Sequence, residues 1–292
     1  MKLLELKIFI SINLFLILIL YFSNNFFYSN FYYQILLFAA PLIWPGLAHG
    51  SLDLHTASRY SLIKNKISLL IFLFVYLLIP LIFFFLWLDF PNTLFVIFLI
   101  LSGMHFGISD RLTNQKKLKH LEVFIRALII LIFPIIFHPE ETNRLFSFFL
   151  VNNEFYFYLY SFSNYLFYFL IMAIPYFFFK IYLIKKIIII SELIALIFCF
   201  LYFKPLVSFL IYFCFLHSIR HLNNEQIKFK ISLKKLIIKT IPMTLIVIIL
   251  FSSSAIYFEN IDDIGKKLNY FIIALSSLTI SHVLLINFFN KD

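Results

Sequence analysis

Residues 67–88 read ISLLIFLFVYLLIPLIFFFLWL and contain no charged side chain. A transmembrane helix needs about 20 consecutive, mostly apolar residues, so this stretch is long enough to cross a membrane. Apolar and polar residues do not alternate in it, as they would in a strand of a membrane barrel. The stretch therefore predicts a membrane-spanning helix.

Similar apolar segments recur along the whole chain. At about 20 residues per span plus short loops, 292 residues have room for roughly eight to ten helices. We therefore predict an all-α, polytopic membrane protein with a single domain over residues 1–292. Lys204-Pro205 joins the seventh and eighth segments, so two spans, a kinked element or a re-entrant pair fit there. The ten segments are residues 3–22, 31–49, 67–88, 92–109, 120–138, 155–179, 187–203, 205–222, 236–257 and 267–289.

Composition excludes the main soluble classes. Hydrophobic residues make up 63% of the chain and charged residues 13%, whereas an ordinary soluble domain is about 45–50% apolar and about 25% charged. Too little polar surface is available for a water-soluble enzyme, a disordered chain or a secreted disulfide-rich protein. Cys199 and Cys214 lie inside apolar segments and have neither metal-site nor disulfide-framework spacing.

The basic residues predict the orientation in the membrane. With a cytoplasmic N-terminus, 20 of the 24 Lys and Arg residues fall on the cytoplasmic side. This bias predicts ten spans with both termini in the cytoplasm, and it explains the net charge of +10 without a nucleic-acid partner. The charged residues expected on the opposite side are Arg144, Lys204, Lys266, Lys267, Asp89, Glu140, Glu141, Glu154, Glu259, Asp262 and Asp263.

The first apolar run follows Lys2 and Lys7. No small-residue cleavage site comes after it, only Ser23-Asn24-Asn25. The run is therefore predicted to stay as a helix over residues 1–22 and not to be removed as a signal peptide.

Several histidines are expected to meet at one depth. Ionisable side chains inside apolar spans are costly and are usually retained for function, although one alone can serve only to join helices. The helices that bear five of them all run toward the cytoplasm, so a metal site in the cytoplasmic half of the bundle is predicted. His55, His120 and His138 do not fit this group. The five are His49, His105, His217, His221 and His282.

Local spacing supports a metal site. His217 and His221 lie four residues apart and share one helix face, so one helix can supply two ligands to one metal. Asp53 follows His49, and Asp110 follows His105, by about one helical turn. Each carboxylate is expected to accept the second N–H of an imidazole and so fix its orientation. The other interpretation of these segments is a helix end with Gly and a polar loop.

Imidazole ligands alone suit Zn, Cu, Fe and Ni equally. No Cys lies near the site, so an iron–sulfur cluster is not expected. A neutral four-histidine cage with open positions would suit Fe(II) that binds O2. Three alternatives remain. The first is a di-iron desaturase or hydroxylase, which would show more histidine motifs. The second is a transporter, which would show internal repeats. The third is a haem protein.

The ordered motifs resemble the Brp/Blh family of bacterial and archaeal membrane β-carotene 15,15′-dioxygenases. Gly46-Leu47-Ala48-His49-Gly50-Ser51-Leu52-Asp53 resembles the G-x-P-H-G-x-x-D signature, with Ala48 in place of proline. His105-Phe106-Gly107 with Asp110, then residues 126–146, continue the resemblance. His217-Ser218-Ile219-Arg220-His221 resembles H-S-x-x-H, and Thr279-Ile280-Ser281-His282 resembles T-x-P-H, with Ser281 in place of proline.

The resemblance implies a non-haem Fe(II) enzyme in the cell membrane, with a core over residues 31–289 and the helix at 1–22 as an addition. Such enzymes cleave the central double bond of β-carotene with O2, giving two retinal molecules that serve a microbial rhodopsin. By matching, the iron ligands here are His49, His105, His217 and His221. His282 becomes an extra ligand or a positioning residue, and Asp53 and Asp110 orient ligands.

Overall fold

The structure is a computed structural model that describes residues 2–28, 31–257 and 264–289. Glu259, Asp262 and Asp263, expected on the outer side, lie outside the described residues, as does Lys291 near the C-terminus. Every described element is helical. The seven longest helices are α1 (Lys2–Phe22), α6 (Lys66–Asp89), α7 (Pro91–Asp110), α8 (Lys116–Phe137), α10 (Asn153–Leu183), α14 (Leu233–Tyr257) and α15 (Ile264–Phe289).

Shorter elements connect or continue the long helices. Residues 205–229 run through three consecutive elements and together form one apolar span. The shorter elements are η1 (Phe26–Tyr28), α2 (Phe31–Leu37), α3 (Ala39–Pro41), η2 (Leu42–Leu47), α4 (Ala48–Gly50), α5 (Asp53–Arg59), α9 (Pro139–Ser147), α11 (Ile187–Tyr202), α12 (Pro205–Tyr212), η3 (Phe213–Ser218) and α13 (Ile219–Phe229).

The predicted fold class is confirmed: the chain is a polytopic helical membrane protein. Among the described residues, seven helices are long and apolar enough to cross a membrane, or eight if the pair bent by 62° at residues 31–59 is one span. Counted as eight, the spans meet the lower end of the predicted range. The seventh predicted segment, α11, has 16 residues and rises about 24 Å, less than the roughly 30 Å hydrocarbon core. Two separate helices, α11 and α12, flank Lys204.

Capping residues and prolines mark the starts of several helices. At the start of α6, the Ser68 backbone N–H donates to Asn65 and the Ser68 hydroxyl accepts from the Asn65 N–H, which forms a capping box. Pro91 and Pro205 occupy the first positions of α7 and α12. Proline is favoured there because the missing N–H would have no partner within the helix.

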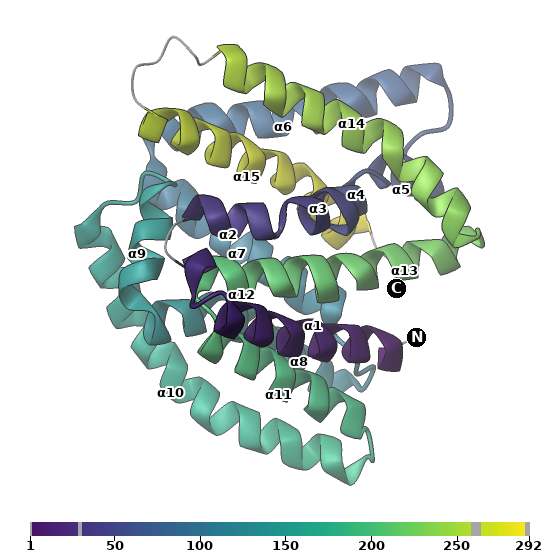
Figure 1. Cartoon of the computed structure of the whole chain (residues 1–292). Helices are drawn as coiled ribbons and strands as arrows, with labels where there is room; N and C mark the ends of the chain where they lie inside the picture. The colour runs from purple at the N-terminus through teal and green to yellow at the C-terminus, as the bar shows by residue number, and fades with distance from the viewer. Residues whose placement is uncertain (1, 29–30, 258–263, 290–292) are drawn as a thin grey trace.

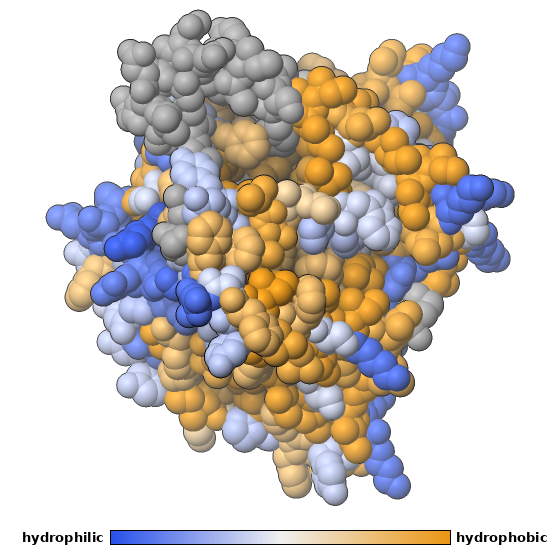
Figure 2. Space-filling model, in the orientation of Figure 1, coloured by the Kyte–Doolittle hydropathy of each residue, from blue (hydrophilic) through white to orange (hydrophobic). Residues whose placement is uncertain are grey.

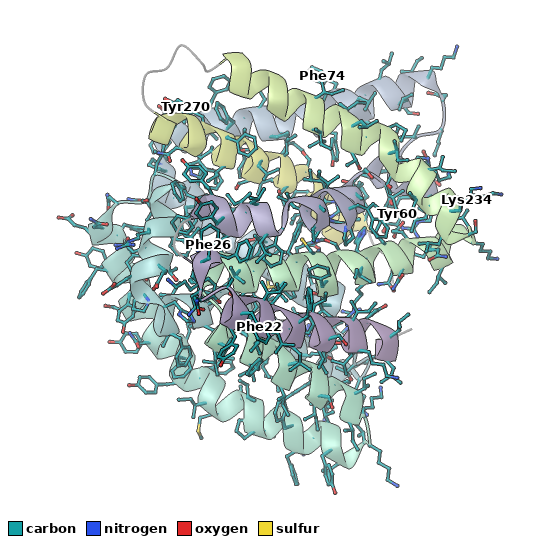
Figure 3. The ribbon with its side chains drawn as sticks, viewed as in Figure 1. Phe22, Phe26, Tyr60, Phe74, Lys234 and Tyr270 are labelled. Carbon is teal, nitrogen blue, oxygen red and sulfur yellow. The ribbon has the colours of Figure 1, made fainter. Side chains whose placement is uncertain are left out.

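Apolar residues cover the outside of the molecule as well as its core. In the most apolar window of α6 only 6% of the residues are buried, and Phe74 is 65% exposed (Figure 3). Figure 2 shows a largely hydrophobic face with hydrophilic residues gathered toward its two sides. Lys234, at the start of α14, is among the exposed residues on one side (Figure 3). This distribution suits contact with lipid.

The helices lie side by side, with α6 and α14 at one edge of the view and α10 and α11 at the other (Figure 1). The elements that carry the five histidines lie between these edges. The main buried cluster joins α8, α10, α11 and α12. Its fully buried members include Ile125, Ile129, Phe177, Leu193, Leu196 and Ile211.

Two glycines allow α7 to pack closely on α8. A Cβ atom at Gly107 would lie 2.4 Å from the backbone oxygen of Val123, and one at Gly103 would lie 2.6 Å from Leu131 Cδ1. Glycine is scarce in this chain, yet Gly103 and Gly107 form a GxxxG pair that flanks His105. The close approach of the two helices therefore fixes where His105 enters the bundle.

Replacing Gly107 with alanine should destabilise the protein by about 1–3 kcal/mol, because the added methyl group meets a backbone atom that cannot turn away. Gly50→Ala is the matched control for stability: its Cβ would lie 3.9 Å from His282 Nδ1, an ordinary contact. Thermal unfolding in detergent measures the difference. Equal melting temperatures for the two variants would contradict the packing argument.

Candidate metal centre and its supporting network

The five predicted histidines meet in one buried cluster. His49 comes from α4, His105 from α7, His217 from η3, His221 from α13 and His282 from α15. The ring of His49 lies 4.9 Å from that of His282, 5.3 Å from that of His217 and 5.5 Å from that of His221. The ring of His105 lies 5.2 Å from that of His217 and 5.1 Å from that of His282. All five are at most 8% exposed.

These spacings suit rings around one ion. With metal–nitrogen bonds of about 2.0–2.1 Å, two imidazole centroids on a tetrahedral ion lie about 5 Å apart. As the side chains stand, however, no three His, Cys, Asp or Glu residues in the described part of the chain have donor atoms placed to hold an ion. Binding here therefore requires some of the rings to turn toward a common point.

The ring nitrogens have the bonding pattern of metal ligands. In three rings the Nδ1 atom is hydrogen-bonded, while Nε2 is buried without a partner. A second nitrogen held by an acceptor is the usual arrangement of a ligating histidine, because it fixes the tautomer and the ring direction. The three pairs are His105 with Asn287 (3.1 Å), His217 with Asp110 (3.4 Å) and His282 with Asp53 (2.9 Å).

The other two rings differ. His49 Nδ1 contacts the Gly46 backbone oxygen and lies 3.3 Å from the Ser218 hydroxyl. In His221 the buried nitrogen without a partner is Nδ1. The predicted sharing of a face by His217 and His221 is confirmed, with their ring centroids 6.5 Å apart.

Both aspartates of the histidine motifs contact the cluster, but not through the preceding histidine. The sequence interpretation paired Asp53 with His49 and Asp110 with His105, whereas the structure pairs them with His282 and His217. Asp110 lies five residues after His105, so it points about 140° away around the helix. Asp53 begins α5 after the chain has turned at residues 51–52.

Each of these carboxylates also accepts a tyrosine hydroxyl. Tyr76 donates to Asp53 and Tyr212 donates to Asp110, both at 2.5 Å. Neither tyrosine, nor Asn287, is indicated by the sequence, because tyrosine is frequent in these helices and no spacing distinguishes the two. The hydroxyls reinforce the orientation of the carboxylates that hold His282 and His217.

Irregular helical segments bring two of the histidines into place. The chain breaks at Trp44, whose φ of −141° and ψ of 119° are not helical, and His49 follows. His217 lies in the π-helical segment η3. Local π-helical widening changes the direction of side chains and is common at functional sites.

The remaining histidines lie apart from the cluster. His55 contacts the ring of Phe229 at 6.2 Å. His120 is exposed in the first turn of α8, and His138 lies between α8 and α9. In the part of the chain that the structure describes, no ring contact joins these three to the five.

A buried network of ion pairs contacts the histidine cluster through Asp110. Arg126 donates to Glu122 at 2.9 Å and to Glu192 at 2.7 Å, and Arg220 donates to Glu192 at 2.5 Å. Arg126 is 1% exposed, and both glutamates are 0% exposed. The sequence interpretation did not identify this network. Glu192, a single acidic residue inside an apolar segment, is a signal that could have revealed it.

Comparison with known proteins decides the family. A sequence model of β-carotene 15,15′-dioxygenase matches residues 40–290. The chain belongs to the β-carotene 15,15′-dioxygenase family. A β-carotene 15,15′-dioxygenase from an uncultured marine bacterium, 66A03, is 30% identical over 256 residues, which cover 85% of this chain and 91% of the relative. No solved structure matches the chain.

The family assignment confirms the resemblance drawn from the ordered motifs, and it makes the chain an enzyme of the β-carotene 15,15′-dioxygenase class. It favours this class over the desaturase, transporter and haem-protein alternatives. All five clustered histidines lie within the matched residues, whereas α1 lies outside them.

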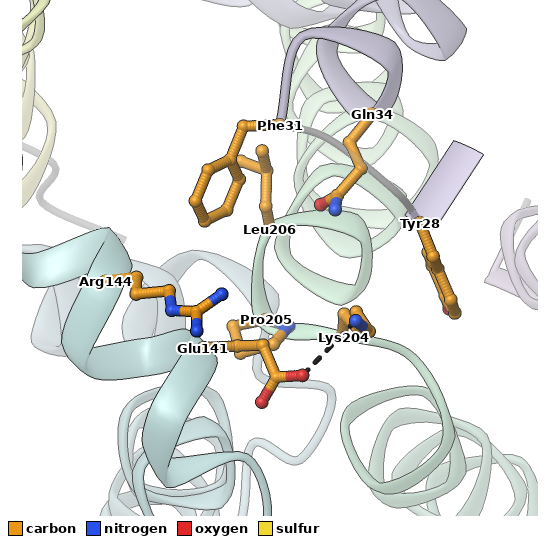
Figure 4. A pocket seen from close by; sticks show the side chains of 8 residues that line it. All are labelled: Tyr28, Phe31, Gln34, Glu141, Arg144, Lys204, Pro205 and Leu206. Atoms are coloured by element: carbon orange, nitrogen blue, oxygen red, sulfur yellow. Dashed lines mark ion pairs between the residues drawn. The ribbon is translucent and has the colours of Figure 1, made fainter. Parts of the chain in front are cut away.

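A cavity of about 90 Å³ lies near the starts of α2 and α12, and none of the five clustered histidines lines it. Lys204 pairs with Glu141 there at 3.3 Å (Figure 4). Burial raises the pKa of Glu141, but hydrogen bonding to its own backbone N–H and the charge of Lys204 together lower it by more. The pKa of this carboxyl therefore lies below its usual range. The lining residues are Tyr28, Phe31, Gln34, Glu141, Arg144, Lys204, Pro205 and Leu206.

Proposed function

We propose that this protein cleaves the central 15,15′ double bond of β-carotene with O2 and gives two all-trans-retinal molecules. The observation that carries the proposal is the cluster of five buried histidines from four membrane segments, within a chain of the dioxygenase family. Three of these rings keep a buried Nε2 without a partner. Such donors fit a metal ion better than they fit a purely structural role.

The donor set fits non-haem Fe(II). His49, His105, His217 and His221 would hold it, and bound iron would supply the activation of O2. His282 has the same bonded Nδ1 and open Nε2 as His105 and His217, so it offers the donor atom of a fifth ligand. Both cysteines are buried, Cys199 in α11 and Cys214 in η3.

The protein's own groups orient the site and keep it dry. Asp110 and Asp53 accept from Nδ1, which leaves the Nε2 lone pairs of His217 and His282 available to a metal ion. The ring of Phe106 packs 4.9 Å from that of His217, and Phe213 stacks on the same ring at 6.0 Å. Converting one double bond and O2 into two aldehydes needs no net proton transfer, so neutral histidines without a general base suit the reaction.

The surroundings suit a lipid-dissolved substrate. β-Carotene resides in the bilayer, so it would enter between the helices without crossing water. We propose that the protein lies in the bacterial or archaeal cell membrane, with both termini and the histidine cluster on the cytoplasmic side. The distribution of Lys and Arg supports this orientation. Retinal released into the same membrane would supply a microbial rhodopsin.

Expression in bacteria that produce β-carotene tests the proposal. The parent chain, with iron supplied, is expected to convert β-carotene into retinal, identified by chromatography and mass, while cells with an empty vector keep the carotene. Added iron chelator should suppress retinal formation. Intact β-carotene despite folded protein in the membrane would refute the proposal, and apocarotenals of unequal length would refute central cleavage. A Soret band in the purified protein would point to haem.

A further inference from the structure

The first helix packs into the bundle although the family match begins after it. The match covers residues 40–290, whereas α1 ends at Phe22. One face of α1 packs against α11, α12, η3 and α13. The side chains on this face recur at helical spacing, as expected for a packed helix. They are Glu5, Leu6, Phe9, Asn13, Leu16 and Leu20, all at most 5% exposed.

Glu5 is the charged member of that face. It is 2% exposed. Its Oε2 atom accepts from Arg220 Nε at 3.0 Å, and its Oε1 atom accepts from Asn223 Nδ2 at 3.1 Å. A carboxylate inside an apolar helix is costly unless it is paired, and such residues are usually kept for function.

Arg220 connects Glu5 to the histidine cluster. Its Nη1 atom donates to the Asp110 backbone oxygen at 2.8 Å and to Glu192 at 3.0 Å, and Nη2 donates to Glu192 at 2.5 Å. Asp110 in turn accepts from His217. The guanidinium therefore holds the end of α7 in place from one side, and Glu5 holds the guanidinium from the other.

We infer that α1 contributes to the histidine site through Glu5, and that Glu5 is a positioning residue. Acting through Arg220 and Asp110, Glu5 fixes the direction of the His217 ring. This inference rests on the proposed metal-binding role of the cluster. A chain without Glu5 would keep the five histidines, but Arg220 would lose the acceptor of its Nε–H and shift toward its remaining carboxylates.

The test is the affinity for Co²⁺, a spectroscopic substitute for Fe²⁺, in the full-length protein in detergent. Visible absorption of the bound ion follows the titration. Glu5→Gln, which keeps the side-chain shape but removes its charge, is expected to raise the dissociation constant about tenfold, as loss of a group that orients a ligand does. Lys7→Gln, an exposed position on the same helix, should leave it unchanged.

A double-mutant cycle separates an effect of Glu5 on the direction of the His217 ring from general stabilisation of the fold. In an Asp110→Asn background, Glu5→Gln should add little further loss, because its route to His217 is already interrupted. Equal dissociation constants for the parent and Glu5→Gln would overturn the inference, even if the metal-free variant unfolds at a lower temperature. Full additivity in the cycle would overturn it as well.

A second variant covers a failure of Glu5→Gln to fold. Asn223→Ala removes the donor to Glu5 Oε1 and leaves the pair with Arg220. It should raise the dissociation constant several-fold, and an unchanged value would again overturn the inference. A parent protein that binds no Co²⁺ would refute the metal site itself and this inference with it. Normal binding by the parent and by Glu5→Gln alike would refute only the role of Glu5.

Discussion

Replacing His217 with alanine is expected to abolish retinal formation and to lower metal affinity by more than about 100-fold, the upper end of what loss of a neighbour that orients a ligand costs. His217 is fully buried, and its ring lies 5.3 Å from that of His49 and 5.2 Å from that of His105. The substitution removes a donor atom and also leaves Asp110 without its histidine partner. Retinal in carotene-producing cells and the iron content of the purified protein measure the effect.

The matched control is His120→Ala, because His120 is exposed at the start of α8 and lies apart from the cluster. That variant should form retinal as the parent does. His221→Ala should behave as His217→Ala, since both rings lie against His49. Retinal at half the parental amount or more from folded His217→Ala would show that this ring is not a ligand.

Replacing Glu192 with leucine should prevent accumulation of folded protein. Glu192 accepts from Arg126 at 2.7 Å and from Arg220 at 3.0 and 2.5 Å, and it is 0% exposed. Removing one partner of a buried ion pair costs about 3–5 kcal/mol, because the remaining charge stays buried. Two arginines lose a partner here, and a folded protein is stable by only about 5–15 kcal/mol.

Size-exclusion chromatography in detergent and thermal unfolding measure the loss. Glu141→Gln is the control, because Glu141 and Lys204 form an ion pair in which both side chains are 33% exposed. Such exposed pairs contribute only about 0–1 kcal/mol. If Glu192→Leu unfolded at the same temperature as Glu141→Gln, the buried network would not support the fold.

The order of the helical membrane segments was predictable from local sequence. Each of the ten apolar segments is helical in the structure. The expectation that His49, His105, His217, His221 and His282 share one level followed from counting crossings, and the ring contacts agree with it. Hydropathy over one segment is enough to locate each span, because the bilayer thickness sets its length.

The bend between α2 and α3, the break at Trp44 and the short α11 were less predictable. A hydropathy pattern reports that a segment is apolar, but the bend of 62° between the helices at 31–37 and 39–59 depends on what packs against it. The close packing of α7 on α8 likewise depends on Val123, which lies on a different helix from Gly107. Such contacts join residues that no local spacing relates.

The sequence by itself determined that this chain is a helical membrane protein and which of its histidines come together. Only the tertiary structure decided the partner of each side chain: Asp53 holds His282, Asp110 holds His217, and Glu5 of the first helix reaches Arg220. The physical reason is one of range. Apolar length and helical spacing act along a single segment, whereas a hydrogen bond between helices depends on the rotation and separation of both.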